Sequence, residues 1–301
     1  MSGVSYDPHS PMFLGAKRTL SDAAGGSGAA TEPGSIVLIG VGYDGTTSFR
    51  PGTRFGPDAI RVASGGLESY SPILDRDLDD VSVVDRGNLE ISFGAPGPVV
   101  EATRAAVAAE LAAGNTTMVL GGEHSISSGA VAAVAAVHPD LLVVQFDAHA
   151  DLRADYLGEP HNHACAMRRC LDVDGVALLQ VGIRSGTRAE FVEMREDGRL
   201  VAPTPAALEA ALARHPDRPI YLTIDLDVFD PAVMPGTGTP EPGGIDWPTF
   251  SALLGVLDSR RIVAGDVMEL APNLDASGCS AVLAAKVTRE IMLVLETPTV
   301  R

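Results

Sequence analysis

The chain is poor in cysteine and in long apolar runs. Its 301 residues contain three cysteines, too few and too irregularly spaced to form a disulfide framework. The longest uncharged segment with helical character, Ser125–Val137, is too short to cross a lipid bilayer. The N-terminus lacks the basic and then apolar order of a signal peptide. These absences argue against a secreted disulfide scaffold and an integral membrane protein, and they predict a protein of the reducing cytoplasm.

Basic residues are also scarce. The 22 Lys and Arg residues stand against 39 Asp and Glu residues, which gives a formal charge of −17. This balance disfavours nucleic acid and anionic membranes as partners, and it favours a small cationic molecule through long-range attraction. Solubility alone explains the charge equally well. Hydrophobic residues make up 46% of the sequence, which is enough for a large buried core and argues against overall disorder.

Apolar runs alternate with helical segments along most of the chain. Residues 1–34 are predicted to form an N-terminal arm, in which the stretch 23–30 has the composition of a flexible surface segment. From residue 35 to residue 301 we find neither an internal repeat nor a linker, which predicts a single domain. Strands that are apolar on both faces and alternate with helices indicate a three-layer αβα fold with a central, mainly parallel sheet.

The elements of this fold can be placed from the pattern. The predicted strands are 36–41, 81–84, 117–120, 141–146, 176–183, 220–224 and 262–267. One predicted helix begins at residue 56, and the others cover 99–113, 125–137, 188–197, 205–214, 246–257 and 281–295. In sheets of this kind, ligands bind beyond the carboxyl ends of the strands.

Three segments rich in metal-binding side chains follow three of these strands. Their candidate ligands are His124, Asp147, His149, Asp151, Asp225 and Asp227. If the extended conformation continues past the strand end, alternate residues such as Asp225 and Asp227 point the same way. Four carboxylates at one sheet edge would repel one another without a cation between them. Since six ligands exceed what one tetrahedral ion needs, we predict two metal ions that share bridging carboxylates.

The same segments resemble the signatures of the ureohydrolase family. They read Gly-Gly-Glu-His-Ser (121–125), Asp-Ala-His-Ala-Asp (147–151) and Asp-Leu-Asp-Val-Phe-Asp-Pro (225–231). The resemblance extends over nearly all of 35–295 and includes the segments 48–57, 236–240 and 268–272. It implies an arginase-like fold, a homotrimer or homohexamer, and two Mn²⁺ ions per subunit. The ligand types by themselves would also accept Co, Ni, Fe or Zn.

The resemblance assigns roles to the six ligands. His124 and Asp151 would bind one Mn²⁺, His149 and Asp227 the other, and Asp147 and Asp225 would bridge the two. The implied reaction is attack of a bridging hydroxide on a guanidinium carbon, which yields urea and an amine. Asp151 is also the candidate for passing a proton to the leaving nitrogen.

Two further residues are candidates for catalysis. His163 aligns with the loop histidine of the family, which acts in proton shuttling or substrate contact, and His161 is the alternative. Glu269 follows the last predicted strand and can pair with two guanidinium N–H groups. We interpret Arg50 and Arg54 as structural ion-pair residues rather than substrate ligands.

The segment 151–160 determines the predicted substrate. It lacks the Asn- and Ser-rich pattern with which arginases bind the α-amino acid group, and it resembles the corresponding segment of bacterial agmatinases. Asp155 and Glu159 favour a cationic tail, although solvated surface charges explain them equally well. We therefore predict hydrolysis of agmatine to putrescine and urea. The alternatives are a guanidino acid such as 4-guanidinobutyrate, for which Arg153 offers a cation, then arginine, then a catalytically silent metal-binding relative.

Overall fold

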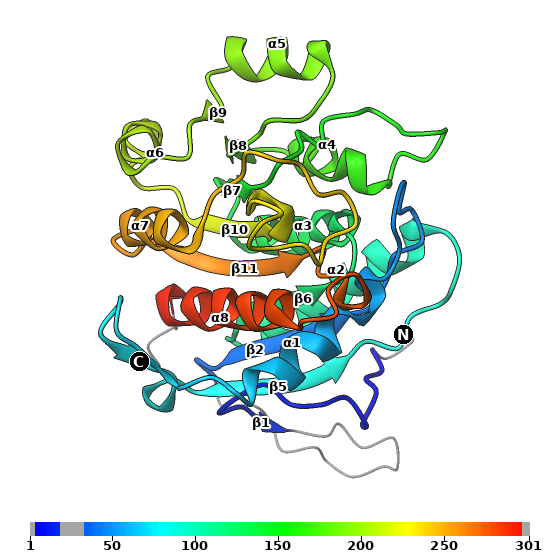
Figure 1. Cartoon of the computed structure of the whole chain (residues 1–301), viewed down its shortest axis with the longest axis vertical. Coiled ribbons are helices and arrows are strands. Elements are labelled where there is room, and N and C mark those ends of the chain that lie inside the picture. Colours follow the sequence, from blue (N-terminus) through cyan, green and yellow to red (C-terminus); the bar gives the residue numbers. More distant parts are fainter. Residues whose placement is uncertain (1–3, 19–32, 297–301) are drawn as a thin grey trace.

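A nine-stranded parallel sheet forms the centre of the molecule in the computed structural model, which describes residues 4–18 and 33–296. Its strands are β1 (Lys17–Arg18), β2 (Ile36–Val41), β5 (Val83–Asn88), β6 (Thr116–Gly121), β7 (Leu142–Phe146), β8 (Ala177–Val181), β9 (Leu200–Val201), β10 (Ile220–Asp225) and β11 (Ile262–Met268). In space they follow the order β1-β5-β2-β6-β11-β10-β7-β8-β9 (Figure 1). A separate antiparallel pair joins β3 (Tyr70–Ser71) to β4 (Arg76–Asp77).

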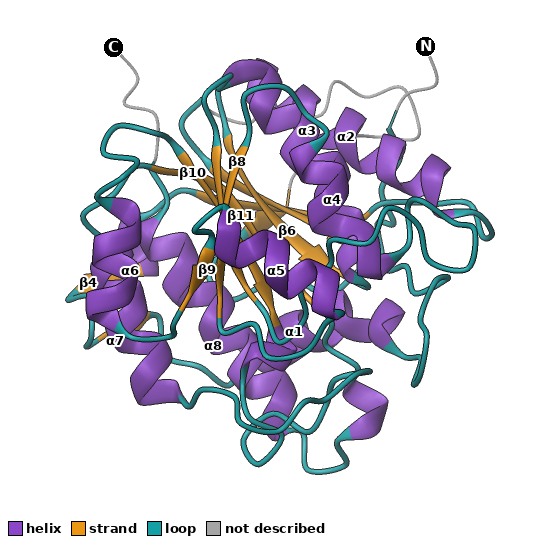
Figure 2. Cartoon of the chain, turned by 90° about the horizontal axis from the view of Figure 1, so that it is seen from above, coloured by secondary structure: helices purple, strands orange, loops and turns teal. Residues whose placement is uncertain are grey.

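Helices cover both faces of the sheet, as Figure 2 shows from above. One face carries α1 (Gly56–Ser64), α6 (Pro205–Leu212), α7 (Trp247–Leu257) and α8 (Cys279–Val294). The other carries α2 (Pro96–Ala112), α3 (Ser127–Val137) and α4 (Ala166–Leu171), and α5 (Arg188–Glu196) joins this side through Met194. Along β2 the side chains alternate: Ile36 packs into the first hydrophobic cluster and Val37 into the second.

The predicted three-layer fold with a central parallel sheet is therefore confirmed. The strands and helices predicted from the pattern are present, with shifted ends. The helix predicted from residue 125 begins at Ser127, because His124–Ile126 forms a 3-10 turn, η3. The elements β1, β9 and α4 were not predicted, since two-residue strands and a six-residue helix are too short to produce a periodic pattern.

The described part of the N-terminal arm packs against the domain. β1 adds to the sheet beside β5, and the side chain of Phe13 is buried in the core. The backbone N–H of Phe13 donates a hydrogen bond to Asp85, which also forms a buried ion pair with Arg61. The stretch 23–30, for which the sequence predicts flexibility, lies outside the described residues. In the described ranges, the structure contains no helix of the length and apolarity that a bilayer crossing requires.

The strand order places four chain segments at one point. β6, β11, β10 and β7 are neighbours in the middle of the sheet, and all run in the same direction. The segments that leave their carboxyl ends contain His124, Glu269, Asp225 and Asp147, respectively. Residues far apart in the sequence therefore meet at the central edge of the sheet.

Candidate metal centre

Tight turns, and not continued strands, bring the candidate ligands together. β7 ends at Phe146, and β10 passes at Asp225 into a second 3-10 turn, η5 (Leu226–Val228). The expectation that the extended conformation continues beyond the strands is therefore wrong. Each turn is held by its leading aspartate: Asp147 accepts a hydrogen bond from the backbone N–H of His149, and Asp225 accepts one from that of Asp227. These i to i+2 hydrogen bonds fold both segments back over the sheet edge.

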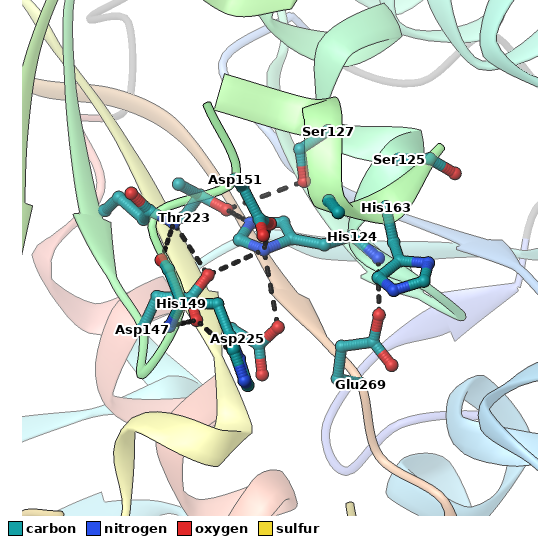
Figure 3. A network of polar contacts seen from close by, with 12 residues as sticks. His124, Ser125, Ser127, Asp147, His149, Asp151, His163, Thr223, Asp225 and Glu269 are labelled. Carbon is teal, nitrogen blue, oxygen red and sulfur yellow. Dashed lines mark hydrogen bonds and ion pairs between the residues drawn. The ribbon is translucent and has the colours of Figure 1, made fainter. Parts of the chain in front are cut away.

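The ligand atoms form two groups that share Asp147. His124, Asp147 and Asp225 make the first group, and Asp147, His149 and Asp227 make the second. Within each group the nearest nitrogen and oxygen atoms of the different side chains lie within 4.8 Å of one another. The sequence predicted that Asp147 and Asp225 bridge two ions; Asp147 belongs to both groups, whereas Asp225 belongs to the first alone. Figure 3 shows His124, Asp147, His149 and Asp225 close together.

Nδ1 of His124 is the centre of the first group. It lies 3.0 Å from Asp147, 3.2 Å from Asp151 and 3.4 Å from Asp225, measured to the Oδ2 atoms. It is buried and has no hydrogen-bond partner of good geometry. An imidazole nitrogen that faces three carboxylates without bonding any of them well has the surroundings of a metal ligand. The donor set therefore fits a divalent cation.

The second group is more accessible to solvent. Nδ1 of His149 lies 2.9 Å from Oδ2 of Asp227, and the His149 side chain is 27% exposed. The Asp227 carboxylate is further fixed by the backbone N–H of Ala148 and the hydroxyl of Thr239. These contacts hold the carboxylate in one orientation, as is common around metal ligands.

Burial perturbs the charge of the cluster. It raises the pKa of Asp151 to about 6, and it raises the pKa of Asp225 well above its ordinary value. Burial would raise the pKa of Asp147 as well, but hydrogen bonds with His124 and His149 bring it below its ordinary value. A bound cation would stabilise the charged forms of all these packed carboxylates together.

Asp151 and Glu269 share an unusual backbone. Their φ angles are 53° and 68°, in the left-handed region that residues other than glycine rarely adopt. Left-handed conformations of this kind are found at functional sites, where the surrounding structure holds them in place. Here they turn the two carboxylates back over the strand ends.

A cavity of about 220 Å³ opens above these ligands. Among the metal ligands and catalytic residues proposed from the sequence, those that line it are His124, His149, Asp151, His163, Asp225 and Glu269. Asp147 and Asp227 are fully buried and lie outside this lining. Glu269 accepts the backbone N–H of His124 at Oε1, which leaves Oε2 for a ligand. Burial, reinforced by Glu123, raises the pKa of Glu269 well above its ordinary value, and a cation beside this carboxylate would stabilise its charged form.

The structure separates the two loop histidines. His163 lines the cavity, whereas His161 does not. The ring of His163 is fixed at both nitrogens, since Nδ1 lies 3.1 Å from the hydroxyl of Thr46 and Nε2 lies 3.1 Å from that of Ser48. Burial lowers the pKa of His163 to about 4, so the ring is neutral near pH 7.

The far end of the cavity contains groups of both signs. Asp155 and Glu159, to which the sequence pointed for a cationic tail, are absent from the lining, and Asp155 accepts a hydrogen bond from Gly158 within its own loop. Arg153 does line the cavity, with its guanidinium 4.8 Å from the ring centre of Tyr156. Glu190 lines it too, but both of its oxygens accept backbone N–H groups.

The sequence did not single out Thr46, Ser48 or Glu190. The first two belong to the loop after β2, which also contains Arg50 and Arg54. Arg54 forms an ion pair with Asp44, as predicted. Arg50 instead donates to the backbone oxygens of residues 237 and 238 and forms no ion pair among the described residues, so its contacts are structural but not ionic. The motif at 48–57 was the available signal for this loop. The sequence did not indicate a role for Glu190 at the site, because its pattern is that of an ordinary residue in an amphipathic helix.

Comparison with known protein families gives a match for this chain. A model described as the arginase family matches residues 34–294. This chain belongs to the arginase family. The arginase-like fold and the resemblance to ureohydrolases are thereby confirmed, and the two ligand groups correspond to the binuclear metal site of the family.

Individual members of the arginase family resemble the whole domain. An agmatinase of Bacillus subtilis is 39% identical over 87% of this chain and 92% of its own length. An N(1)-aminopropylagmatine ureohydrolase of Thermococcus kodakarensis is 41% identical over 80% of this chain and 84% of its own length. Among solved structures, the proclavaminate amidinohydrolase of Streptomyces clavuligerus superposes with a TM-score of 0.80 and 29% identity, covering 94% of this chain and 96% of the other. These relatives are named for different substrates.

Proposed function

We propose that this chain hydrolyses agmatine to putrescine and urea at a centre that binds two Mn²⁺ ions. The observation that carries the proposal is the shared ligand cluster at the central sheet edge, with Glu269 and His163 facing it across one cavity. The agmatinases among the relatives, and the likeness of the segment 151–160 to theirs, support agmatine as the substrate.

The proposed centre uses the five side chains of the two groups together with Asp151, whose Oδ2 lies 3.2 Å from Nδ1 of His124. His124 and Asp151 would hold one ion, His149 and Asp227 the other, and Asp147 and Asp225 would bridge them. Two ions held by these residues would lower the pKa of a bound water from about 15.7 toward about 7 and would thereby make a nucleophile available at neutral pH. Mn²⁺ suits a site of mixed carboxylate and imidazole ligands.

Glu269 is the proposed guanidinium ligand. Glu269 lines the cavity, its Oε1 accepts the backbone N–H of His124, and each carboxylate oxygen can accept more than one hydrogen bond. A guanidinium group paired with this carboxylate would be held with its carbon above the metal ligands, as Figure 3 indicates by the position of Glu269 beside His124. Such positioning lowers the entropy cost of the reaction.

Two residues are proposed to move protons. Asp151 lies at the metal ligands and lines the cavity, where its carboxylate is placed to pass a proton to the leaving nitrogen. His163 is neutral and lies at the cavity wall, where its Nε2 can exchange a proton with the amine product or with solvent.

A guanidino acid is the second candidate substrate, and Arg153 favours it. This cation lines the cavity, and in the described part of the chain it pairs with no carboxylate. It would attract the carboxylate of 4-guanidinobutyrate and repel the ammonium group of agmatine. Glu190 offers little compensation, since both of its oxygens already accept backbone N–H groups.

A substrate screen tests the proposal. The purified chain, loaded with Mn²⁺, is incubated with agmatine, 4-guanidinobutyrate and arginine, and urea and the amine product are both quantified. We expect putrescine and urea in equal amounts from agmatine, at the highest kcat/KM. A higher kcat/KM for 4-guanidinobutyrate would replace agmatine with the second candidate, and no urea from any of the three would contradict the proposed activity.

A further inference from the structure

A second polar network lies on the side of His124 that faces away from the cavity. Nε2 of His124 lies 2.9 Å from the hydroxyl of Thr223 on β10. The register partner of Thr223 on β11 is Asp266, so the two side chains project from the same face of the sheet. The hydroxyl of Tyr221, two residues before Thr223, donates to Oδ2 of Asp266 at 2.7 Å. Figure 3 shows Thr223 and Ser127 beside the ring of His124.

The direction of these hydrogen bonds follows from the role of Nδ1. A ring nitrogen that binds a metal ion carries no proton, so the proton of neutral His124 resides on Nε2 and is donated to Thr223. A hydroxyl has a single hydrogen, and that of Thr223 is then free for another acceptor. Oδ1 of Asp266 is buried, and the hydroxyls of Thr223, Tyr221 and Ser127 are the side-chain groups that approach the Asp266 carboxylate. The chain of donors therefore runs from His124 through Thr223 to Asp266.

Asp266 otherwise has no evident reason to be buried. Its carboxylate is fully buried within the sheet and forms no ion pair among the residues that the structure describes. Burying an unpaired carboxylate is costly, and tyrosine and threonine hydroxyls compensate for only part of the lost hydration. A His124 ring that is polarised by a bound cation would supply the missing positive charge through the intervening hydroxyl.

We propose that Asp266 is a positioning residue for the metal centre. Acting through the hydroxyl of Thr223, it holds His124 with Nε2 protonated and Nδ1 turned toward the ion. A carboxylate behind a ligating histidine fixes the tautomer of the ring and raises its basicity as a ligand. The inference rests on the proposed role of His124 as a metal ligand, and it is independent of which guanidino compound is the substrate.

Metal binding to the metal-depleted full chain tests this proposal. Mn²⁺ binding is measured by equilibrium dialysis for the wild type, Thr223→Val, Thr223→Ser and Asp266→Asn, and the absorption spectrum is recorded with Co²⁺. We expect Thr223→Val and Asp266→Asn to weaken one of the two equivalents by about 10–100-fold and to change the Co²⁺ spectrum. Thr223→Ser keeps the hydroxyl and is expected to bind both equivalents as the wild type does.

Thr117→Val is the matched control. It removes a buried threonine hydroxyl from β6 of the same sheet without touching the network. Equal weakening by Thr117→Val and Thr223→Val would show a general packing effect and overturn the proposal. Wild-type binding by Thr223→Val and Asp266→Asn would overturn it as well. If those two variants do not fold, Tyr221→Phe is used instead, because it removes one hydrogen bond to Asp266. A metal affinity equal to that of the wild type would then count against a role of Asp266 in positioning His124.

Failure of the proposed metal centre can be distinguished from failure of the proposed role of Asp266. If the wild-type chain itself binds no metal, the proposed centre fails, whatever the variants do. If the wild type binds two equivalents and the variants match it, the centre stands and the role of Asp266 alone is lost.

Discussion

The hydroxyl of Thr46 lies 3.1 Å from Nδ1 of His163. The same hydroxyl donates its hydrogen to Oε1 of Glu123, at 2.5 Å, so toward the imidazole it acts as an acceptor. Nδ1 of His163 must therefore carry the proton of the neutral ring, and Nε2 is left as the basic nitrogen. Thr46 thus selects the tautomer that presents a proton acceptor at the cavity wall.

Replacing Thr46 by valine should lower kcat and leave KM nearly unchanged. The loss is expected to be smaller than the roughly 10²–10⁴-fold that removal of a general acid-base group costs, because His163 itself remains. Steady-state kinetics with the preferred substrate measure the effect. Thr46→Ser should retain activity. Thr47→Val, in the neighbouring residue that donates to the backbone of Asp44, is the control. Equal kcat values for Thr46→Val and the control would contradict this role.

Acid should destabilise the chain through His163. Burial lowers its pKa to about 4 in the folded state, whereas the unfolded side chain has a pKa of about 6.5. The folded pKa is depressed, so this contribution to stability is present above pH 6.5 and is lost as the pH falls toward 4. The slope reaches at most about 1.4 kcal/mol per pH unit. Urea unfolding of the metal-depleted protein at several pH values should therefore show a shallower acid limb for His163→Gln, and identical limbs would refute the assignment.

Asp147→Asn should remove metal binding and turnover together. Asp147 is the one residue common to both ligand groups, so its loss weakens both ions. Removing a residue that hydrogen-bonds a metal ligand already lowers metal affinity by about 10–100-fold. Removing a ligand that both ions share should lower it further. Metal content by elemental analysis and urea release are measured on the same preparation. Asp155→Asn, in an exposed loop outside the cavity lining, is the matched control. Two bound ions with full activity in Asp147→Asn would end the bridging assignment.

Glu269→Gln should reduce guanidinium binding while the metals stay bound. The substitution keeps the side-chain shape but replaces a charge-assisted hydrogen bond by a neutral one. Charge-assisted hydrogen bonds contribute about 1.5–3 kcal/mol, and their loss corresponds to a decrease in kcat/KM of roughly 10–100-fold. The control is Glu241→Gln, a partly exposed carboxylate that does not line the cavity. An unaltered kcat/KM would exclude Glu269 from the substrate site.

Arg153→Gln should change the preference between substrate tails. Removing the cation at the cavity wall relieves repulsion of the agmatine ammonium and weakens attraction of the 4-guanidinobutyrate carboxylate. At a solvent-screened distance each effect is of the order of 1 kcal/mol or less, so the ratio of the two kcat/KM values should move by roughly threefold to tenfold toward agmatine. A ratio equal to that of the wild type would mean that Arg153 acts only through its packing on Tyr156.

The sequence anticipated the ligand set better than the geometry that assembles it. The apolar strands before His124, Asp147 and Asp225 identify the sheet edge, because a buried parallel strand leaves a strong pattern. The alternation argument for Asp225 and Asp227 was wrong, since a turn held by the Asp225 side chain replaces the strand there. Side-chain to backbone hydrogen bonds of this kind depend on local geometry that hydrophobic periodicity does not encode.

Residue types and their place along the chain were thus determined by the sequence: which strands are buried, which acids and histidines follow them, and which family the motifs resemble. Only the tertiary structure decided that His163 lines the cavity and His161 does not, that Arg153 reaches it while Asp155 does not, and that Thr46 fixes the imidazole. The physical reason is that the loop after β7, which contains the first four of these residues, packs against the loop after β2, which contains Thr46. Their meeting depends on the order of strands in the sheet and on the packing of the helices, which couple positions more than a hundred residues apart.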